Sequence, residues 1–195
     1  MARFRNPIRL GIFFTAFALI ATAGAARALA QASGGFDFKT ASLADIKDSE
    51  SKFVDLAKAI PADKYTWRPG EGVRSVSEVF LHIASANYGL PTMLGAAPAV
   101  GFNRQGFEKS TTDKDKVIEQ LNKSFAYLES AVDKTSDAEL NKRMKLFGGK
   151  EGTAGDILFL IITDLHEHLG QMIAYARVNS VVPPWSAARQ RPSGH

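Results

Sequence analysis

Apolar side chains recur every three or four residues in four stretches of this chain, which is the spacing that places them on one face of an α-helix. The stretches are 43–59, 76–94, 114–134 and 154–179. No stretch shows a convincing strand-like alternation of apolar and polar residues. We therefore expect an all-α fold, and four helices of this length are typical of a four-helix bundle.

Residues that favour helix ends flank these stretches. Ser42, Thr112 and Thr153 are the expected N-caps, and Ser75 followed by Glu78 predicts a capping box. Pro91 is expected to kink the second helix or to end it early. A short helical turn is expected over 137–141. The segment 96–112 is rich in glycine, alanine and proline, so it predicts a long crossover loop between the second and third helices.

The first 30 residues have the features of an export signal. Residues 1–9 hold three arginines and no acid, residues 10–25 are apolar but too short to span a membrane, and Ala28-Leu29-Ala30 offers a cleavage site. We expect cleavage before Gln31 and a periplasmic or secreted protein; an uncleaved N-terminal anchor is the alternative. After the signal we expect a leader over 31–41, the bundle over 42–186 and a disordered tail over 187–195.

The basic character of the whole chain comes from this signal. The chain has 24 basic and 20 acidic residues, but Arg3, Arg5, Arg9 and Arg27 lie in the signal, which has no acid. The mature chain would have no net charge, so we expect no nucleic-acid binding. Because cleavage removes the apolar segment, we expect no stable membrane anchor afterwards. The chain has no cysteine, which excludes disulfides, thiolate metal ligands and a cysteine nucleophile.

Asp164 and His168 are the first candidates for chemistry. On a helix they lie about 40° apart, on the same stripe as Ile157, Ile161 and Met172, which should face the core. A carboxylate on such a stripe is costly unless a charge compensates it. A metal ion held with His168 would provide that charge. The alternative is that Asp164 pairs with a cation such as Arg68 or Arg74.

His82 is a candidate partner from the second helix, although a lone histidine on an apolar face can also be an ordinary core residue. His166 is expected at the surface or at an interface, because side chains two positions apart on a helix point in nearly opposite directions and cannot easily share one ion with His168. Glu78 could orient the His82 ring, but its role in the capping box is the simpler interpretation.

Several motifs resemble one known family when they are taken in order. These are YTWRPGEGVRS at 65–75, SEVFLHIA at 77–84, EHLGQMIAYAR at 167–177 and VPP at 182–184. Together they resemble the DinB-like (DinB/YfiT-like) superfamily over residues 42–186. The resemblance implies an up-down-down-up bundle that is often dimeric and holds a divalent metal near one end, usually through three histidines. Characterised relatives include thiol transferases and a mycothiol-dependent isomerase.

The resemblance also implies which residues bind the metal here. His82 and His168 match two of the three histidines, and the third position is Asp164. Such a set would suit Zn²⁺, Ni²⁺, Mn²⁺ or Fe²⁺. The expected function is that of an exported metal-dependent hydrolase or thiol transferase with an unknown small-molecule substrate. The alternative is a non-catalytic helical binding or dimerisation module whose metal site is degenerate.

Overall fold

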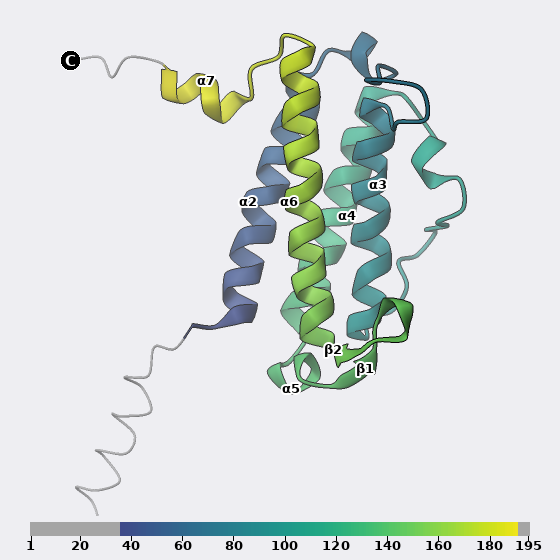
Figure 1. The fold of residues 1–195 in the computed structure, drawn as a ribbon, viewed down its shortest axis with the longest axis vertical. Helices are drawn as coiled ribbons and strands as arrows, with labels where there is room; N and C mark the ends of the chain where they lie inside the picture. Colours follow the sequence, from purple (N-terminus) through teal and green to yellow (C-terminus); the bar gives the residue numbers. More distant parts are fainter. Residues whose placement is uncertain (1–35, 191–195) are drawn as a thin grey trace, which may run out of the picture. The chain divides into compact units, whose positions relative to one another are not determined.

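The structure is a computed structural model that describes residues 36–190. The expected export signal, residues 31–35 of the expected leader and residues 191–195 lie outside the described residues. Four long helices dominate the described part of the chain: α2 (Phe38–Ala59), α3 (Val76–Gly89), α4 (Lys114–Lys134) and α6 (Ala154–Val178) (Figure 1). The all-α prediction is confirmed, with one small hairpin added.

Each long helix packs against two others. α2 and α3 both contact α4 and α6. The Lys39 side chain at the start of α2 donates to the Asp133 carbonyl at the end of α4, and Lys114 at the start of α4 donates to the carbonyls of Lys58 and Ile60. α2 and α4 are therefore antiparallel. α3 and α4 run in the same direction, so the long segment between them returns along the side of the bundle (Figure 1).

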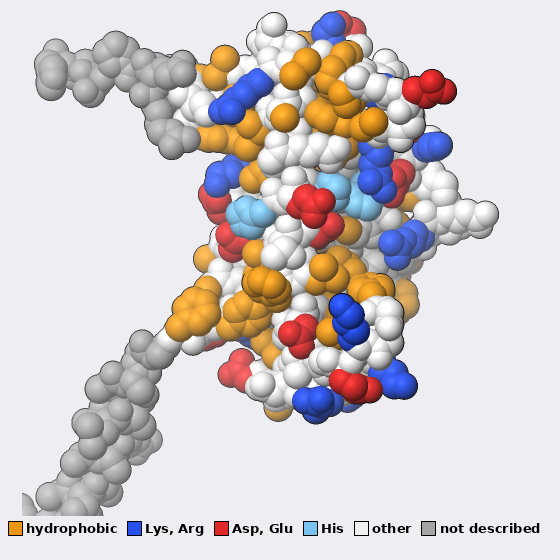
Figure 2. Space-filling model, viewed as in Figure 1, with side chains coloured by type: hydrophobic (Ala, Val, Ile, Leu, Met, Phe, Trp, Pro, Cys, Tyr) orange, Lys and Arg blue, Asp and Glu red, His pale blue; other side chains and the backbone are white. Residues whose placement is uncertain are grey.

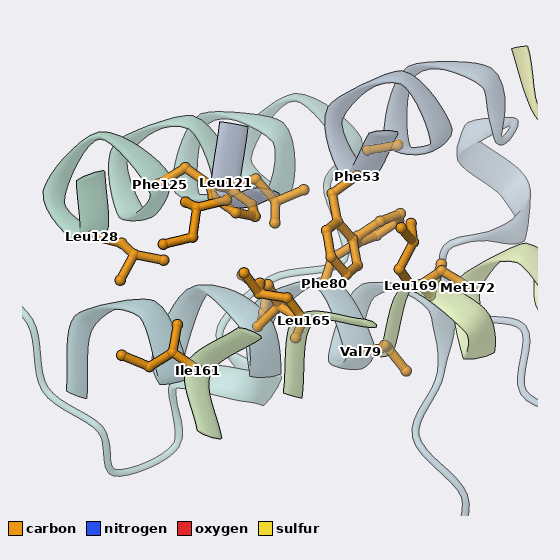
Figure 3. Close-up of a cluster of buried hydrophobic side chains, with 14 of the residues drawn as sticks. Phe53, Val79, Phe80, Leu121, Phe125, Leu128, Ile161, Leu165, Leu169 and Met172 are labelled. Atoms are coloured by element: carbon orange, nitrogen blue, oxygen red, sulfur yellow. The ribbon is translucent and has the colours of Figure 1, made fainter. Parts of the chain in front are cut away.

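The core lies between the four helices and takes side chains from all of them (Figure 3). Phe53 of α2 and Phe125 of α4 stack with ring centroids 6.0 Å apart, and Phe80 and Leu165 complete this layer from α3 and α6. The α6 stripe of Ile157, Ile161 and Met172 is buried. The apolar stripe predicted for α4 is fully buried too, and it consists of Val117, Leu121, Phe125, Leu128 and Val132. Periodicity in the sequence therefore identified the faces that pack together.

The first helix begins earlier than its sequence predicts. Ser42 was expected as the N-cap, but α2 starts at Phe38, so Ser42 lies inside the helix, where its hydroxyl donates to the Phe38 carbonyl. The extra turn is held by tertiary contacts, because Phe38 packs against the core and Lys39 reaches the end of α4. The expected leader over 31–41 is wrong from residue 38 onward.

Most other helix ends agree with the sequence. Ser75 and Glu78 form the expected capping box, and Thr153 forms another with Asp156. α3 ends at Gly89 and continues as a 3₁₀ turn over Leu90–Leu94, which contains Pro91. The expected turn near residue 137 is the short helix α5 (Asp137–Leu140). The cap of α4 is Asp113 instead of Thr112, since the Asp113 carboxylate accepts from the Lys116 amide.

Two elements were not predicted. β1 (Arg143–Lys145) and β2 (Glu151–Thr153) form an antiparallel hairpin whose connection uses Gly148 and Gly149 at positive φ. Three-residue strands are too short to leave a period in the sequence. The helix α7 (Pro184–Gln190) covers the start of the expected disordered tail. A proline suits the first turn of a helix, and Trp185 packs against the core.

Within residues 36–190, α6 alone is long and apolar enough to cross a membrane by length and composition. The core helix of a bundle meets the same criterion, and α6 contacts both α2 and α3.

Candidate metal centre

His82, Asp164 and His168 meet on one side of the bundle. One potential ligand atom from each lies within 4.8 Å of those of the other two. The two imidazole rings meet edge to face with centroids 4.6 Å apart, and Nε2 of His168 lies 3.5 Å from Oδ1 of Asp164. Asp164 and His168 are one turn apart on α6, and the packing of α3 on α6 brings His82 to them.

Glu108 orients the His82 ring. The Nδ1 atom of His82 lies 2.7 Å from a Glu108 carboxylate oxygen. Arg74 holds the same carboxylate through its Nε at 2.7 Å and a second guanidinium nitrogen at 3.3 Å. Partial burial tends to raise the pKa of Glu108, but the hydrogen bonds from Arg74 and His82 outweigh burial and lower the pKa below its usual value. Glu108 is therefore an ionised acceptor, and His82 donates to it through Nδ1–H.

A chain of hydrogen bonds fixes the His168 ring in the same way. The Arg74 carbonyl can only accept, so the Tyr175 hydroxyl donates to it, at 3.1 Å. The Tyr175 oxygen then accepts from Nε2 of Gln171, at 3.0 Å. This turns the Gln171 amide oxygen toward Nδ1 of His168, at 2.9 Å, and the ring must donate to it.

Both imidazoles therefore carry their ring proton on Nδ1 when neutral, which leaves the lone pair of each Nε2 free. This is the usual state of a histidine metal ligand, whose second nitrogen is held by a carboxylate or an amide oxygen. Two ligands of one tetrahedral ion lie about 3.4 Å apart. The separation of 3.5 Å between Asp164 and His168 fits that geometry.

The pKa of His168 is raised above its usual value. The hydrogen bond with Asp164 is the largest cause; burial opposes it, and the hydrogen bond with Gln171 adds to it. Asp164 and His168 are thus placed to share a positive charge, which can be a proton or a metal ion. That shared positive charge compensates the half-buried Asp164 carboxylate on the core stripe of α6.

The charged residues around the site have partners of their own. The alternative that Asp164 pairs with Arg68 or Arg74 is wrong, since Arg68 pairs with Glu78 at 3.2 Å and Arg74 pairs with Glu108. Glu78 serves the capping box, as expected. His166 is exposed, as expected, and its ring lies 2.9 Å from a carboxylate oxygen of Asp45 on α2.

Sequence reasoning missed Glu108, because it lies in the long crossover loop, where no periodicity exists. Its 3₁₀ turn (Phe107–Lys109) is anchored by aromatic packing. The rings of Phe102 and Phe107 pack against Tyr88 of α3, with centroids 4.9 and 6.1 Å away. Two phenylalanines shortly before an acid in a loop were the one available signal.

The site is open to solvent on one side. Figure 2 shows histidine side chains at the surface in the middle of this face, bordered by acidic and basic side chains. The side chain of His82 is 20% exposed and that of His168 is 11% exposed, so a small molecule can approach both.

Solved structures with the same fold come from several proteins. A DinB-like protein from Bacillus cereus ATCC 10987 matches 70% of this chain and 89% of its own, with a TM-score of 0.60 and 15% identity. A DinB-like protein from Bacillus subtilis matches 71% of this chain and 91% of its own, with a TM-score of 0.56 and 18% identity.

A mycothiol-dependent maleylpyruvate isomerase also shares the fold, with a TM-score of 0.57 and 14% identity over 71% of this chain. The chain spans 63% of the length of that isomerase. No curated protein matches the sequence. The family model of the DinB superfamily matches residues 45–172, which include α3, α4, most of α2 and α6, and the three residues of the candidate site. The chain belongs to the DinB superfamily.

Proposed function

We propose that this protein is an exported enzyme that binds one divalent metal ion through His82, Asp164 and His168. The observation that carries the proposal is the fixed tautomer of both histidines. Glu108 and Gln171 occupy the two Nδ1 atoms, which leaves Nε2 of each ring as its available ligand atom in the cluster with Asp164. An ordinary core histidine also needs an acceptor for its ring N–H, but it does not need to meet a second imidazole and a carboxylate at one point, as these two rings do.

Two nitrogens and one carboxylate oxygen suit Zn²⁺, Ni²⁺, Mn²⁺ or Fe²⁺ and leave positions open for a substrate. A metal in such a site lowers the pKa of a coordinated water or thiol, or polarises a substrate oxygen. The protein's own residues would hold the ion, keep both rings in the correct tautomer and maintain the ionised state of Glu108.

Two reaction classes remain candidates: hydrolysis and thiol transfer. The shared fold of the mycothiol-dependent isomerase supports thiol chemistry. The chain has no cysteine, so a small-molecule thiol would have to supply the sulfur. If the protein is exported, as residues 1–30 predict, it would meet few such thiols, which supports hydrolysis. The mass of the N-terminal peptide of protein recovered from the periplasm would show whether cleavage before Gln31 occurs.

The deciding experiment is metal content by mass spectrometry after chelator treatment and reconstitution with each of the four ions. We expect about one ion per chain in the wild type and in His166→Ala, and loss of the ion in His82→Ala and His168→Ala. His166→Ala is the matched control, because it removes an imidazole two residues from His168 that lies outside the cluster.

If the wild type retains none of the four ions, the enzyme proposal fails and the non-catalytic binding or dimerisation module takes its place. One observation favours that second candidate: Asp164 already has a protein partner in His168, so the site can be satisfied without an ion. Metal-loaded protein would next be assayed with ester and amide substrates and with a thiol plus an electrophile.

A further inference from the structure

A cavity of about 590 Å³ opens beside the candidate metal centre. Its polar lining is made by three cations, two carboxylates and one amide: Arg68, Arg74, Lys109, Glu78, Glu108 and Gln171. Glu108 contacts His82, and Gln171 contacts His168. A molecule in this cavity would therefore be separated from each imidazole by a single side chain.

Both carboxylates of the cavity are already compensated. Glu78 accepts from the Ser75 amide at 2.7 Å and pairs with Arg68, and the hydrogen bond from Ser75 is the main reason that its pKa is lowered. Glu108 accepts from Arg74 and His82. Neither carboxylate needs a further cation.

Lys109 is the cation of the cavity that makes no hydrogen bond or ion pair with the residues that the structure describes, and its side chain is exposed. Its charge acts on Glu78 at longer range and is a minor cause of the lowered pKa of that carboxyl. Three cations against two ionised carboxylates give the cavity a net charge of +1. Arg68 adds donors at the rim, because its bonds to the Val73 carbonyl and to Glu78 leave other N–H groups of the guanidinium free.

We infer that this cavity binds an anionic group, a carboxylate or a phosphate, with Lys109 as its main contact and Arg68 as a second. This inference rests on the proposed function and extends it: the anion is the part of the substrate that holds the molecule beside the metal centre. With a divalent ion bound, the two imidazoles and the Asp164 carboxylate would form a centre with a net charge of +1. The field of that centre would also attract an anion.

The inference is tested by calorimetric titration of succinate and of inorganic phosphate, separately, into the wild type, Lys109→Gln and Lys150→Gln at low ionic strength. Lys150→Gln is the matched control, because it removes the same charge from an exposed position in the hairpin connection, outside the cavity. Metal content is measured on the same samples, and circular dichroism verifies the fold of each variant.

We expect at least one probe to bind the wild type, and its Kd to rise about fivefold or more in Lys109→Gln while Lys150→Gln stays within twofold of the wild type. The probe that binds identifies the anion as carboxylate or phosphate. The inference is overturned if neither probe binds the wild type, or if the two variants behave alike. If the wild type holds no metal ion but still binds the anion in a Lys109-dependent way, the metal proposal is refuted and the anion site remains.

Discussion

Glu50 of α2 and Glu129 of α4 form a carboxyl pair at the α2–α4 contact, away from the candidate metal centre. Burial raises the pKa of Glu50 to about 7, with further contributions from a hydrogen bond to Glu129 and from its negative charge, while Lys47 lowers it. Oε1 of Glu129 is buried and has no hydrogen-bond partner among the described residues. Below about pH 7, Glu50 therefore keeps a proton in the fold.

The sign of the pH dependence follows from this raised pKa. In the unfolded chain Glu50 releases its proton near pH 4.5, whereas in the fold it does so near pH 7. The folded state binds the extra proton between these values, so its contribution to stability is complete below pH 4.5 and is lost as the pH rises through 7. Glu50 is partly exposed, so solvent screening reduces the effect, and we expect about 1 kcal/mol between pH 5 and pH 8.

Glu50→Gln imitates the protonated carboxyl at every pH, because the amide can donate to Glu129. We expect the variant to match the wild type at pH 5 and to exceed its free energy of unfolding by about 1 kcal/mol at pH 8, equivalent to about 2–4 °C in Tm. Urea unfolding of metal-free protein at both values measures this, with the exposed Glu151→Gln as control. If wild type and Glu50→Gln lose the same stability between pH 5 and pH 8, Glu50 does not keep this proton in the fold.

Two further predictions concern the site and the core. Glu108→Gln removes the charge that orients His82, so we expect the Kd for the metal ion to rise about tenfold with little change in Tm. An unchanged Kd would mean that Glu108 does not support the site. Phe125→Ala leaves a cavity at the centre of the core and should lower the free energy of unfolding by about 3–5 kcal/mol, measured by chemical unfolding. The control Phe147→Ala changes a side chain that is 57% exposed and should lower it by less than about 0.5 kcal/mol. Comparable losses in the two variants would contradict the assigned core.

The helices could be predicted from sequence because their periodicity records burial directly. The bounds of α4 agree with the prediction at both ends, and its five apolar stripe residues are all buried. The errors lie where tertiary contacts decide the structure. Lys39 reaches across to α4 and stabilises a turn of α2 before Ser42, and Trp185 packs the start of α7 against the core. A local sequence signal does not contain such contacts.

The site was predictable in part for the same reason. Asp164 and His168 could be paired because helical geometry fixes residues four positions apart. His82 could be assigned to the same site only through the family resemblance, because the local sequence does not indicate which helix packs against α6. Glu108 could not be found, because its position depends on how 18 residues of irregular chain between Gly95 and Lys114 fold back over α3.

The two halves of the site therefore depend on different parts of the structure. Asp164 and His168 continue the buried stripe of α6, so the core fixes their positions. His82 depends on Glu108, which is held by the aromatic contacts of Phe107 in an exposed loop. Loops open locally at lower free energy than a helical core does. A change in the loop should consequently alter how His82 presents its Nε2 atom without unfolding the bundle, which makes the crossover loop the part of this chain where site chemistry can vary most independently of stability.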